Sequence, residues 1–186
     1  MEASLTNQEY AEVISECRKL YEAKLKDYGT AWHVLRPSSL TDQIYIKVNR
    51  IRNIQIHCNQ KIEEDIRGEF IGVINYSIIA LIQLEIGFEE VPISTDIALE
   101  KYDKYAGQAF DLMSNKNHDY GEAWRNMRIS SLVDIILMKI LRVKQIEDLH
   151  GKTVVSEGLD ANYFDMLNYA VFSLIKLNEA ESIPRV

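Results

Sequence analysis

At 186 residues, the chain is long enough for one or two small domains with a buried core. Its formal net charge of -7 argues against a surface for DNA or RNA polymers, which usually carries a basic stripe. A few local cations can still bind a small anion. The two cysteines, Cys17 and Cys58, form no C-x-x-C motif and are typical of reduced thiols in a cytoplasmic protein.

The most apolar segment, Phe70 to Ile86, spans about 17 residues between charged flanks. A transmembrane helix needs about 20 consecutive apolar residues, so this segment is better suited to a buried core helix. The N-terminal residues show no signal-peptide pattern. We therefore expect no membrane association.

Scarce proline and glycine, three and eight residues respectively, favour long helices. Residues 6–9 (T-N-Q-E) fit a capping box, in which a threonine hydroxyl and a glutamate bond free backbone amides at a helix start. The first helix is expected to end at Asp27 or Tyr28, before a capping Gly29. It is followed by a connection to the next helix.

A second capping box, at residues 39–42 (S-L-T-D), predicts a helix that ends near Cys58. Helical spacing gives it one apolar face, formed by Leu40, Ile44, Val48 and Ile51. A third helix is expected from near Ile62 to Ile86, with Gly87 as its cap.

The same plan follows in the second half of the chain. After a linker over residues 87–94, a helix is expected from near Thr95 to just before Gly121. A capping box at residues 131–134 (S-L-V-D) predicts the next helix, and the last should cover residues 155–179. No segment alternates with a period of two for long enough to indicate a sheet. The fold class is therefore all-α, a bundle of six main helices.

The chain also repeats itself, because residues 24–54 and 116–146 are identical at 15 of 31 positions. The retained charged and hydroxyl residues are Lys24/Lys116, Asp27/Asp119, Arg36/Arg128, Ser38/Ser130, Ser39/Ser131, Asp42/Asp134, Lys47/Lys139 and Arg50/Arg142. A scaffold is expected to keep its apolar pattern and let its charges vary, so these pairs indicate a polar site. We predict two pseudosymmetric three-helix units, residues 1–90 and 91–186, forming a monomer with an internal pseudo-twofold or a homodimer.

The motif K-x-x-D-Y-G closes the first helix of each unit. Its residues are Lys24, Asp27, Tyr28 and Gly29 in the first copy and Lys116, Asp119, Tyr120 and Gly121 in the second. A helix C-terminus explains the lysine, which complements the helix dipole, and the glycine, which caps the helix. It does not explain the aspartate, because a carboxylate is unfavourable at this end of a helix. A binding role therefore stands beside the structural one.

A tryptophan follows each of these glycines by three positions, as Trp32 and Trp124. Large aromatic side chains usually belong to the core. The alternative is a platform on which a nucleotide base stacks.

The second helix of each unit combines acids and cations. Helix geometry places Lys47 at the edge of the apolar stripe and Arg50 two turns after Asp42 on the same face. Structural ion pairs would keep these residues, and so would a site for phosphate oxygens. The capping boxes alone also explain Asp42 and Asp134. The candidate phosphate-binding cations are Lys24, Arg36, Lys47, Arg50, Lys116, Arg128, Lys139 and Arg142.

The third helices align with a shift of 93 residues, which places Asn75 over Asn168 and Gly72 over Asp165. Both helices are apolar nearly all round and therefore central, so each amide must be hydrogen-bonded. Only the second copy has an acid beside its asparagine, and a buried carboxylate needs a cation, a metal or a proton. We expect the second copy to hold the fuller site, with Mg²⁺ ligands Asp134, Glu157 and Asp165.

Cations that bind phosphate oxygens and carboxylates that hold Mg²⁺ together fit a magnesium nucleotide better than a sugar or a lipid. The sequence has no P-loop and no G-x-G-x-x-G, G-x-S-x-G or H-E-x-x-H motif. We therefore expect a protein that binds a free nucleotide. The alternative is a non-catalytic helical scaffold or interaction protein whose duplicated charges form ion pairs.

The strings K-x-x-D-Y-G-x-A-W, R-x-S-S-L-x-D, K-x-x-R and D-x-x-N-Y resemble the family called nucleotide modification associated domain 1. The resemblance covers both repeats and implies a role in nucleotide metabolism or modification. The family's helical plan is similar to that of MazG-like nucleoside triphosphate pyrophosphohydrolases, which implies Mg²⁺-dependent hydrolysis of a nucleoside phosphate. The resemblance points to Lys116, Asp119, Tyr120, Arg128, Lys139, Arg142, Asp165 and Asn168, with their first-copy partners.

Overall fold

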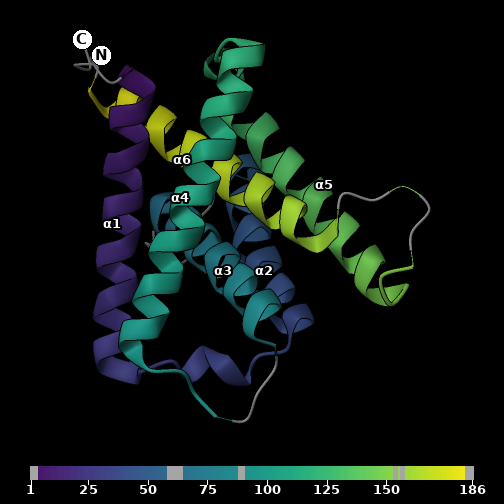
Figure 1. The fold of residues 1–186 in the computed structure, drawn as a ribbon. Coiled ribbons are helices and arrows are strands. Elements are labelled where there is room, and N and C mark those ends of the chain that lie inside the picture. Colours follow the sequence, from purple (N-terminus) through teal and green to yellow (C-terminus); the bar gives the residue numbers. More distant parts are fainter. Residues whose placement is uncertain (1–3, 58–64, 88–90, 153–154, 156–157, 183–186) are drawn as a thin grey trace.

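The computed structural model describes residues 4–57, 65–87, 91–152, 155 and 158–182. These residues form helices and connections with no strand (Figure 1), which confirms the all-α prediction. The elements are α1 (Leu5–Tyr28), the 3-10 helix η1 (Ala31–Val34), α2 (Pro37–His57), α3 (Ile66–Ile86), α4 (Thr95–Tyr120), the 3-10 helix η2 (Ala123–Asn126), α5 (Ile129–Asp148) and α6 (Gly158–Ser182).

Glycines end three of these helices as predicted. Gly29 and Gly121 close α1 and α4, both with a φ of 59°, and Gly87 closes α3 with a φ of 78°. A positive φ is strained for residues with a side chain, so glycine is favoured at each of these stops. After Gly29 and Gly121 the chain reverses into a short 3-10 helix that carries a tryptophan.

The predicted helix starts are wrong in three places. The N-cap of α1 is Ser4, whose hydroxyl accepts from the Asn7 amide, and Thr6 lies inside the helix. The capping boxes at residues 39–42 and 131–134 also lie inside helices, because α2 begins at Pro37 and α5 at Ile129. Proline suits a first helical position because it has no amide hydrogen to leave unpaired.

The acids of those two supposed boxes connect the repeats instead. Asp42 of α2 forms an ion pair with Lys144 of α5 at 2.5 Å, and Asp134 of α5 faces Arg52 of α2 at 3.7 Å. Position 144 is the repeat counterpart of position 52, so the two ion pairs are related by the duplication. The capping interpretation of both aspartates was therefore wrong.

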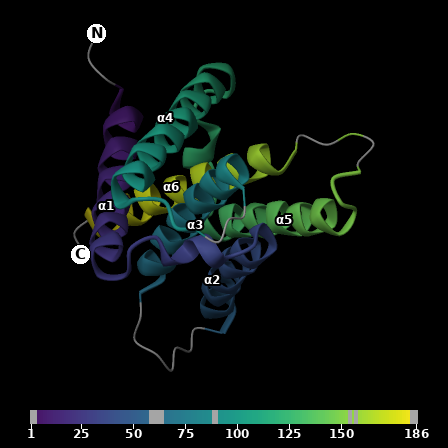
Figure 2. The same ribbon diagram turned by 60° about the horizontal axis from the view of Figure 1, so that its bottom comes forward.

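The helices are arranged with an internal pseudo-twofold. The second helices α2 and α5 contact each other, as do the third helices α3 and α6 and the first helices α1 and α4. Each first helix also packs against the third helix of the other repeat, α1 against α6 and α4 against α3. Figures 1 and 2 show α1 and α4 side by side. One apolar core contains side chains of all six helices, so the repeats stabilise each other.

Among the described helices, α3 alone has the length and apolar composition needed to cross a membrane. It is a buried helix of the core, with 72% of its most apolar window inside the protein. Burial of this kind is expected of a central helix in a bundle, as its uniformly apolar sequence predicted.

Candidate functional site

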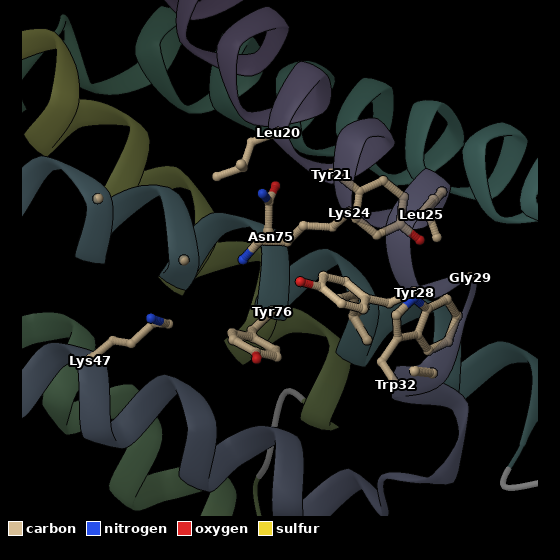
Figure 3. Close-up of a pocket in the computed structure, with 14 residues that line it drawn as sticks. Leu20, Tyr21, Lys24, Leu25, Tyr28, Gly29, Trp32, Lys47, Asn75 and Tyr76 are labelled. Atoms are coloured by element: carbon tan, nitrogen blue, oxygen red, sulfur yellow. The ribbon is translucent and has the colours of Figure 1, made fainter.

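Two pockets, one in each repeat, are lined by equivalent residues. The first pocket has a volume of about 210 Å³ and the second about 470 Å³. The shared lining of the first pocket (Figure 3) is Tyr21, Lys24, Leu25, Tyr28, Ala31, Trp32, Gly72, Asn75, Tyr76 and Ile79. In the second pocket the counterparts are Met113, Lys116, Asn117, Tyr120, Ala123, Trp124, Asp165, Asn168, Tyr169 and Phe172. The duplicated residues thus converge in space.

The K-x-x-D-Y-G motif is divided by the helix geometry. Lys24 and Tyr28 are one turn apart on the face of α1 that lines the first pocket, as residues at i and i+4 are. Asp27 and Asp119 are exposed and line neither pocket. Gly29 turns the chain back, so that Trp32 of η1 lines the same pocket as Lys24. The structure therefore brings the lysine, tyrosine and tryptophan together but leaves the aspartate outside.

In the second repeat, Asp165 of α6 receives two lysines. Lys116 Nζ lies 2.7 Å from Asp165 Oδ1, and Lys139 Nζ lies 2.6 Å from Asp165 Oδ2. Lys139 is only 7% exposed. A buried ammonium is costly without a close anion, so this carboxylate explains why α5 tolerates a lysine beside its apolar face.

In the first repeat, Glu69 of α3 has the corresponding role. It pairs with Lys47 at 3.3 Å and also with Arg50. Glu69 lies one helical turn before Gly72, the counterpart of Asp165, and its own counterpart in α6 is Asn162. The sequence comparison overlooked Glu69. Its signal was a carboxylate in an almost wholly apolar helix, close enough to Gly72 to share a face.

The buried asparagines are held by tyrosines of the opposite repeat. Asn168 accepts a hydrogen bond from Tyr10 at 2.7 Å and donates to the Ala109 carbonyl at 3.2 Å. Asn75 likewise accepts from Tyr102 at 2.9 Å and donates to the Cys17 carbonyl at 3.1 Å. Burial raises the pKa of both tyrosines, which remain neutral donors. Each asparagine is therefore fixed where it lines its pocket.

The aromatic side chains differ in accessibility. Trp124 is 4% exposed and stacks on Phe172 with ring centroids 4.3 Å apart, so it belongs to the core. Trp32 is only partly buried. Tyr28 and Tyr120, by contrast, are 72% and 76% exposed at the rims of their pockets. These two tyrosines are the aromatic groups best placed to meet a ligand from solvent.

Other predicted site residues lie away from the pockets. Arg36 and Arg128 are exposed at the starts of α2 and α5 and line neither pocket. Arg142 is exposed, whereas its counterpart Arg50 pairs with Glu69.

The carboxylates expected to hold Mg²⁺ are engaged elsewhere or not described. Asp134 faces Arg52, Asp165 binds two lysines, and Glu157 lies outside the described residues. The described part of the chain contains no group of three or more His, Cys, Asp or Glu side chains placed to hold a metal ion. The described residues thus bring no such set of protein ligands together, and the expected Mg²⁺ site stays a prediction.

These features define an all-α tandem-repeat protein with two related pockets. The chain belongs to the nucleotide modification associated domain 1 family, which matches it twice, over residues 24–84 and 116–177, more than half of its length. No curated protein and no solved structure matches the chain. The similarity to MazG-like hydrolases therefore stays a prediction. The family name indicates a nucleotide-related role.

Proposed function

We propose that the protein binds a nucleotide in the pocket formed by α1, η1, α2 and α3, whose lining residues recur in the pocket formed by α4, η2 and α6. The observation that carries this proposal is the convergence, twice in one chain, of a lysine, an exposed tyrosine, a tryptophan and a fixed asparagine on one pocket. Lysine ammonium groups bind phosphate oxygens. Aromatic faces such as that of Tyr28 bind bases by stacking.

The first pocket takes its lining groups from α1, η1, α2 and α3. Figure 3 shows Lys24 on α1 and Lys47 on α2. Tyr28 and Trp32 lie on the side of Asn75 away from Lys47. Burial raises the pKa of Tyr21, so the phenol in the wall stays neutral and adds no charge against a phosphate. Among the described residues, the charged side chains that line this pocket are Lys24 and Lys47.

Mg²⁺-dependent hydrolysis is the finer prediction from the family resemblance. Turnover is tested directly by incubating the protein with nucleoside triphosphates and Mg²⁺ and analysing the products.

Binding is tested by thermal shift and calorimetry with canonical and modified deoxynucleoside mono-, di- and triphosphates, each with and without Mg²⁺. At least one nucleotide should raise the melting temperature of the wild type. Lys24→Ala and Tyr28→Ala should each weaken that binding by about tenfold or more, as for a lost charge-assisted bond or stacking contact. The matched control is Lys26→Ala, an exposed α1 lysine that pairs with Glu22 outside both pockets. If no nucleotide shifts the wild type, the proposal is wrong.

The second candidate is a non-catalytic scaffold, which the engaged charges favour. Lys47, Arg50, Lys116 and Lys139 all contact carboxylates, and ion pairs also connect α2 with α5. A scaffold predicts that Lys24→Ala changes no ligand response and that the other lysines matter for stability alone. The nucleotide panel separates the two functions.

A further inference from the structure

Among the positions at which the two pockets differ, one lies between their lysines. In the second repeat that position is Asp165, and in the first it is Gly72. The lysines themselves are equivalent, Lys116 and Lys139 in the second repeat and Lys24 and Lys47 in the first. The second repeat therefore shows what the lysine pair can bind.

Asp165 is bound as an anionic ligand would be. Each of its two oxygens receives one ammonium group, at 2.7 Å from Lys116 and 2.6 Å from Lys139. Such charge-assisted contacts are short and strong. Two lysines from two different helices thus surround one anionic group supplied by a third helix.

In the first repeat no described residue places a carboxylate at position 72. An ideal Cβ on Gly72 would lie 2.4 Å from Lys47 Cε and 2.9 Å from Lys47 Nζ, so the Lys47 side chain occupies the volume of the missing side chain. Lys47 reaches Glu69 only at 3.3 Å. Lys24 is exposed at the pocket and forms no ion pair with a described residue.

We propose that the first pocket binds the phosphate of a nucleoside monophosphate between Lys24 and Lys47, in the place that the Asp165 carboxylate occupies in the second pocket. This inference rests on the nucleotide-binding function proposed above and adds its ligand class, its location and its stoichiometry of one per chain. A phosphate monoester carries a charge of about -1.5 to -2 at neutral pH, which matches two ammonium groups.

Glu69 permits this exchange of partners. When Lys47 turns to the phosphate, Glu69 keeps its contact with Arg50, so no buried carboxylate is left without a cation. The second pocket has no such freedom, because Asp165 repels a phosphate and already forms an ion pair with each of its lysines. The duplication has therefore produced one open anion site and one that the protein fills itself.

The main test is Gly72→Asp, which supplies the first pocket with its own carboxylate. The three atoms nearest to an added Cβ all belong to the flexible end of the Lys47 side chain, so the variant should fold and keep or raise its melting temperature. Gly72→Asn has nearly the same shape without the charge and is the matched control. The probes are the four canonical deoxynucleoside 5′-monophosphates, their nucleosides and inorganic phosphate, measured by calorimetry.

We expect the wild type to bind one equivalent of a monophosphate more tightly than the matching nucleoside. Gly72→Asp should bind it at least tenfold more weakly than Gly72→Asn does. The reciprocal change, Asp165→Gly in an otherwise wild-type chain, should raise the stoichiometry from one to two where the variant folds. The Gly72 comparison stands even if it does not.

Each adverse result has a distinct meaning. Equal binding by Gly72→Asp and Gly72→Asn places the anion elsewhere and overturns this inference, while nucleotide binding stands. Wild-type binding of nucleoside triphosphates but of no monophosphate does the same. If no nucleotide of any kind binds, the proposed function itself is wrong.

Discussion

The third helices of the two repeats, α3 and α6, each supply a carboxylate to a lysine, but from different positions. Both face a lysine from the second helix of their own repeat. In α3 the acid is Glu69, followed by Gly72, and in α6 the sequence at these positions is Asn162 and Asp165. The duplicated lysine has kept a carboxylate partner while that partner has moved by one turn. A buried cation needs an anion nearby, but that anion can come from more than one position in the sequence.

Contacts between the repeats have diverged less. Tyr10 binds Asn168 as Tyr102 binds Asn75, and Asp42 pairs with α5 as Asp134 pairs with α2. The acid on the third helix, by contrast, differs between the repeats and changes the charge that a ligand meets.

The largest expected effect tests the two acids against each other. Asp165→Ala removes the carboxylate beside the buried Lys139 and should lower the free energy of unfolding by about 3–5 kcal/mol. Glu69→Ala should cost only about 1–2 kcal/mol, because its partners Lys47 and Arg50 are about a quarter exposed and can reach water. Urea denaturation of both variants measures the difference. Equal losses would show that the two repeats bury their ion pairs to the same extent.

A second, smaller effect tests the symmetry of the core. Tyr10→Phe and Tyr102→Phe each leave the side-chain oxygen of a buried asparagine without its donor, at a cost of about 1–3 kcal/mol. The two losses should agree within about 0.5 kcal/mol. Tyr45→Phe, on a ring that lies under Lys144 and whose hydroxyl bonds no described residue, is the control. Clearly unequal losses would contradict the pseudo-twofold account of these contacts.

The helices themselves could be predicted from the sequence, and the outcome at Gly29, Gly87 and Gly121 shows why. Each of these glycines ends a helix for a local reason, because glycine readily adopts the positive φ found there. A glycine that follows an apolar periodic segment can be recognised from a short stretch of sequence. Helix starts were less predictable. The pattern S-L-T-D matches a capping box, yet Asp42 lies inside α2 and forms an ion pair with Lys144, a partner that is distant in sequence.

The residues of the candidate site could be predicted from the sequence, but the ion pairs that they form could not. Lys24, Trp32 and Asn75 were identified because duplication retained them, and the structure places them at one pocket. Glu69 was missed because the alignment of the two repeats matches Asp165 with Gly72 and not with Glu69. Residues three apart on a helix are neighbours in space. An acid displaced by one turn is therefore not aligned with its counterpart, although it lies in nearly the same place in the structure.

A third prediction concerns the arginines of the second helices. Arg50→Ala should lower the free energy of unfolding by about 1 kcal/mol, because Arg50 binds Glu69. Arg142→Ala should change it by less than about 0.5 kcal/mol, since Arg142 is exposed and forms no ion pair with a described residue. Chemical denaturation of the two variants in parallel provides the measurement. A large loss for Arg142→Ala would favour the scaffold function, in which this arginine is a structural partner.

The smallest expected effect is a pH dependence confined to the end of α3. Hydrogen bonds from Lys104 and Tyr105 of α4, with Lys101 nearby, lower the pKa of Glu85 to about 2. The counterpart in α6 is the uncharged Asn178, which accepts from Arg67. Because the pKa of Glu85 is lower in the folded than in the unfolded protein, its contribution to stability is present above about pH 5 and is lost as the pH falls toward 2.

Glu85→Gln should therefore be less stable than the wild type at pH 7, and the gap should shrink between pH 5 and pH 3. The gap is measured as the difference in denaturation midpoints, and it should be modest because the Glu85 side chain is about a third exposed. Glu100→Gln, on the exposed face of α4 with no ion pair to a described residue, should follow the wild type at every pH. A pH-independent gap for Glu85→Gln would mean that Glu85 acts through packing. The charge of Glu85 would then not distinguish the end of α3 from the end of α6, where Asn178 is its counterpart.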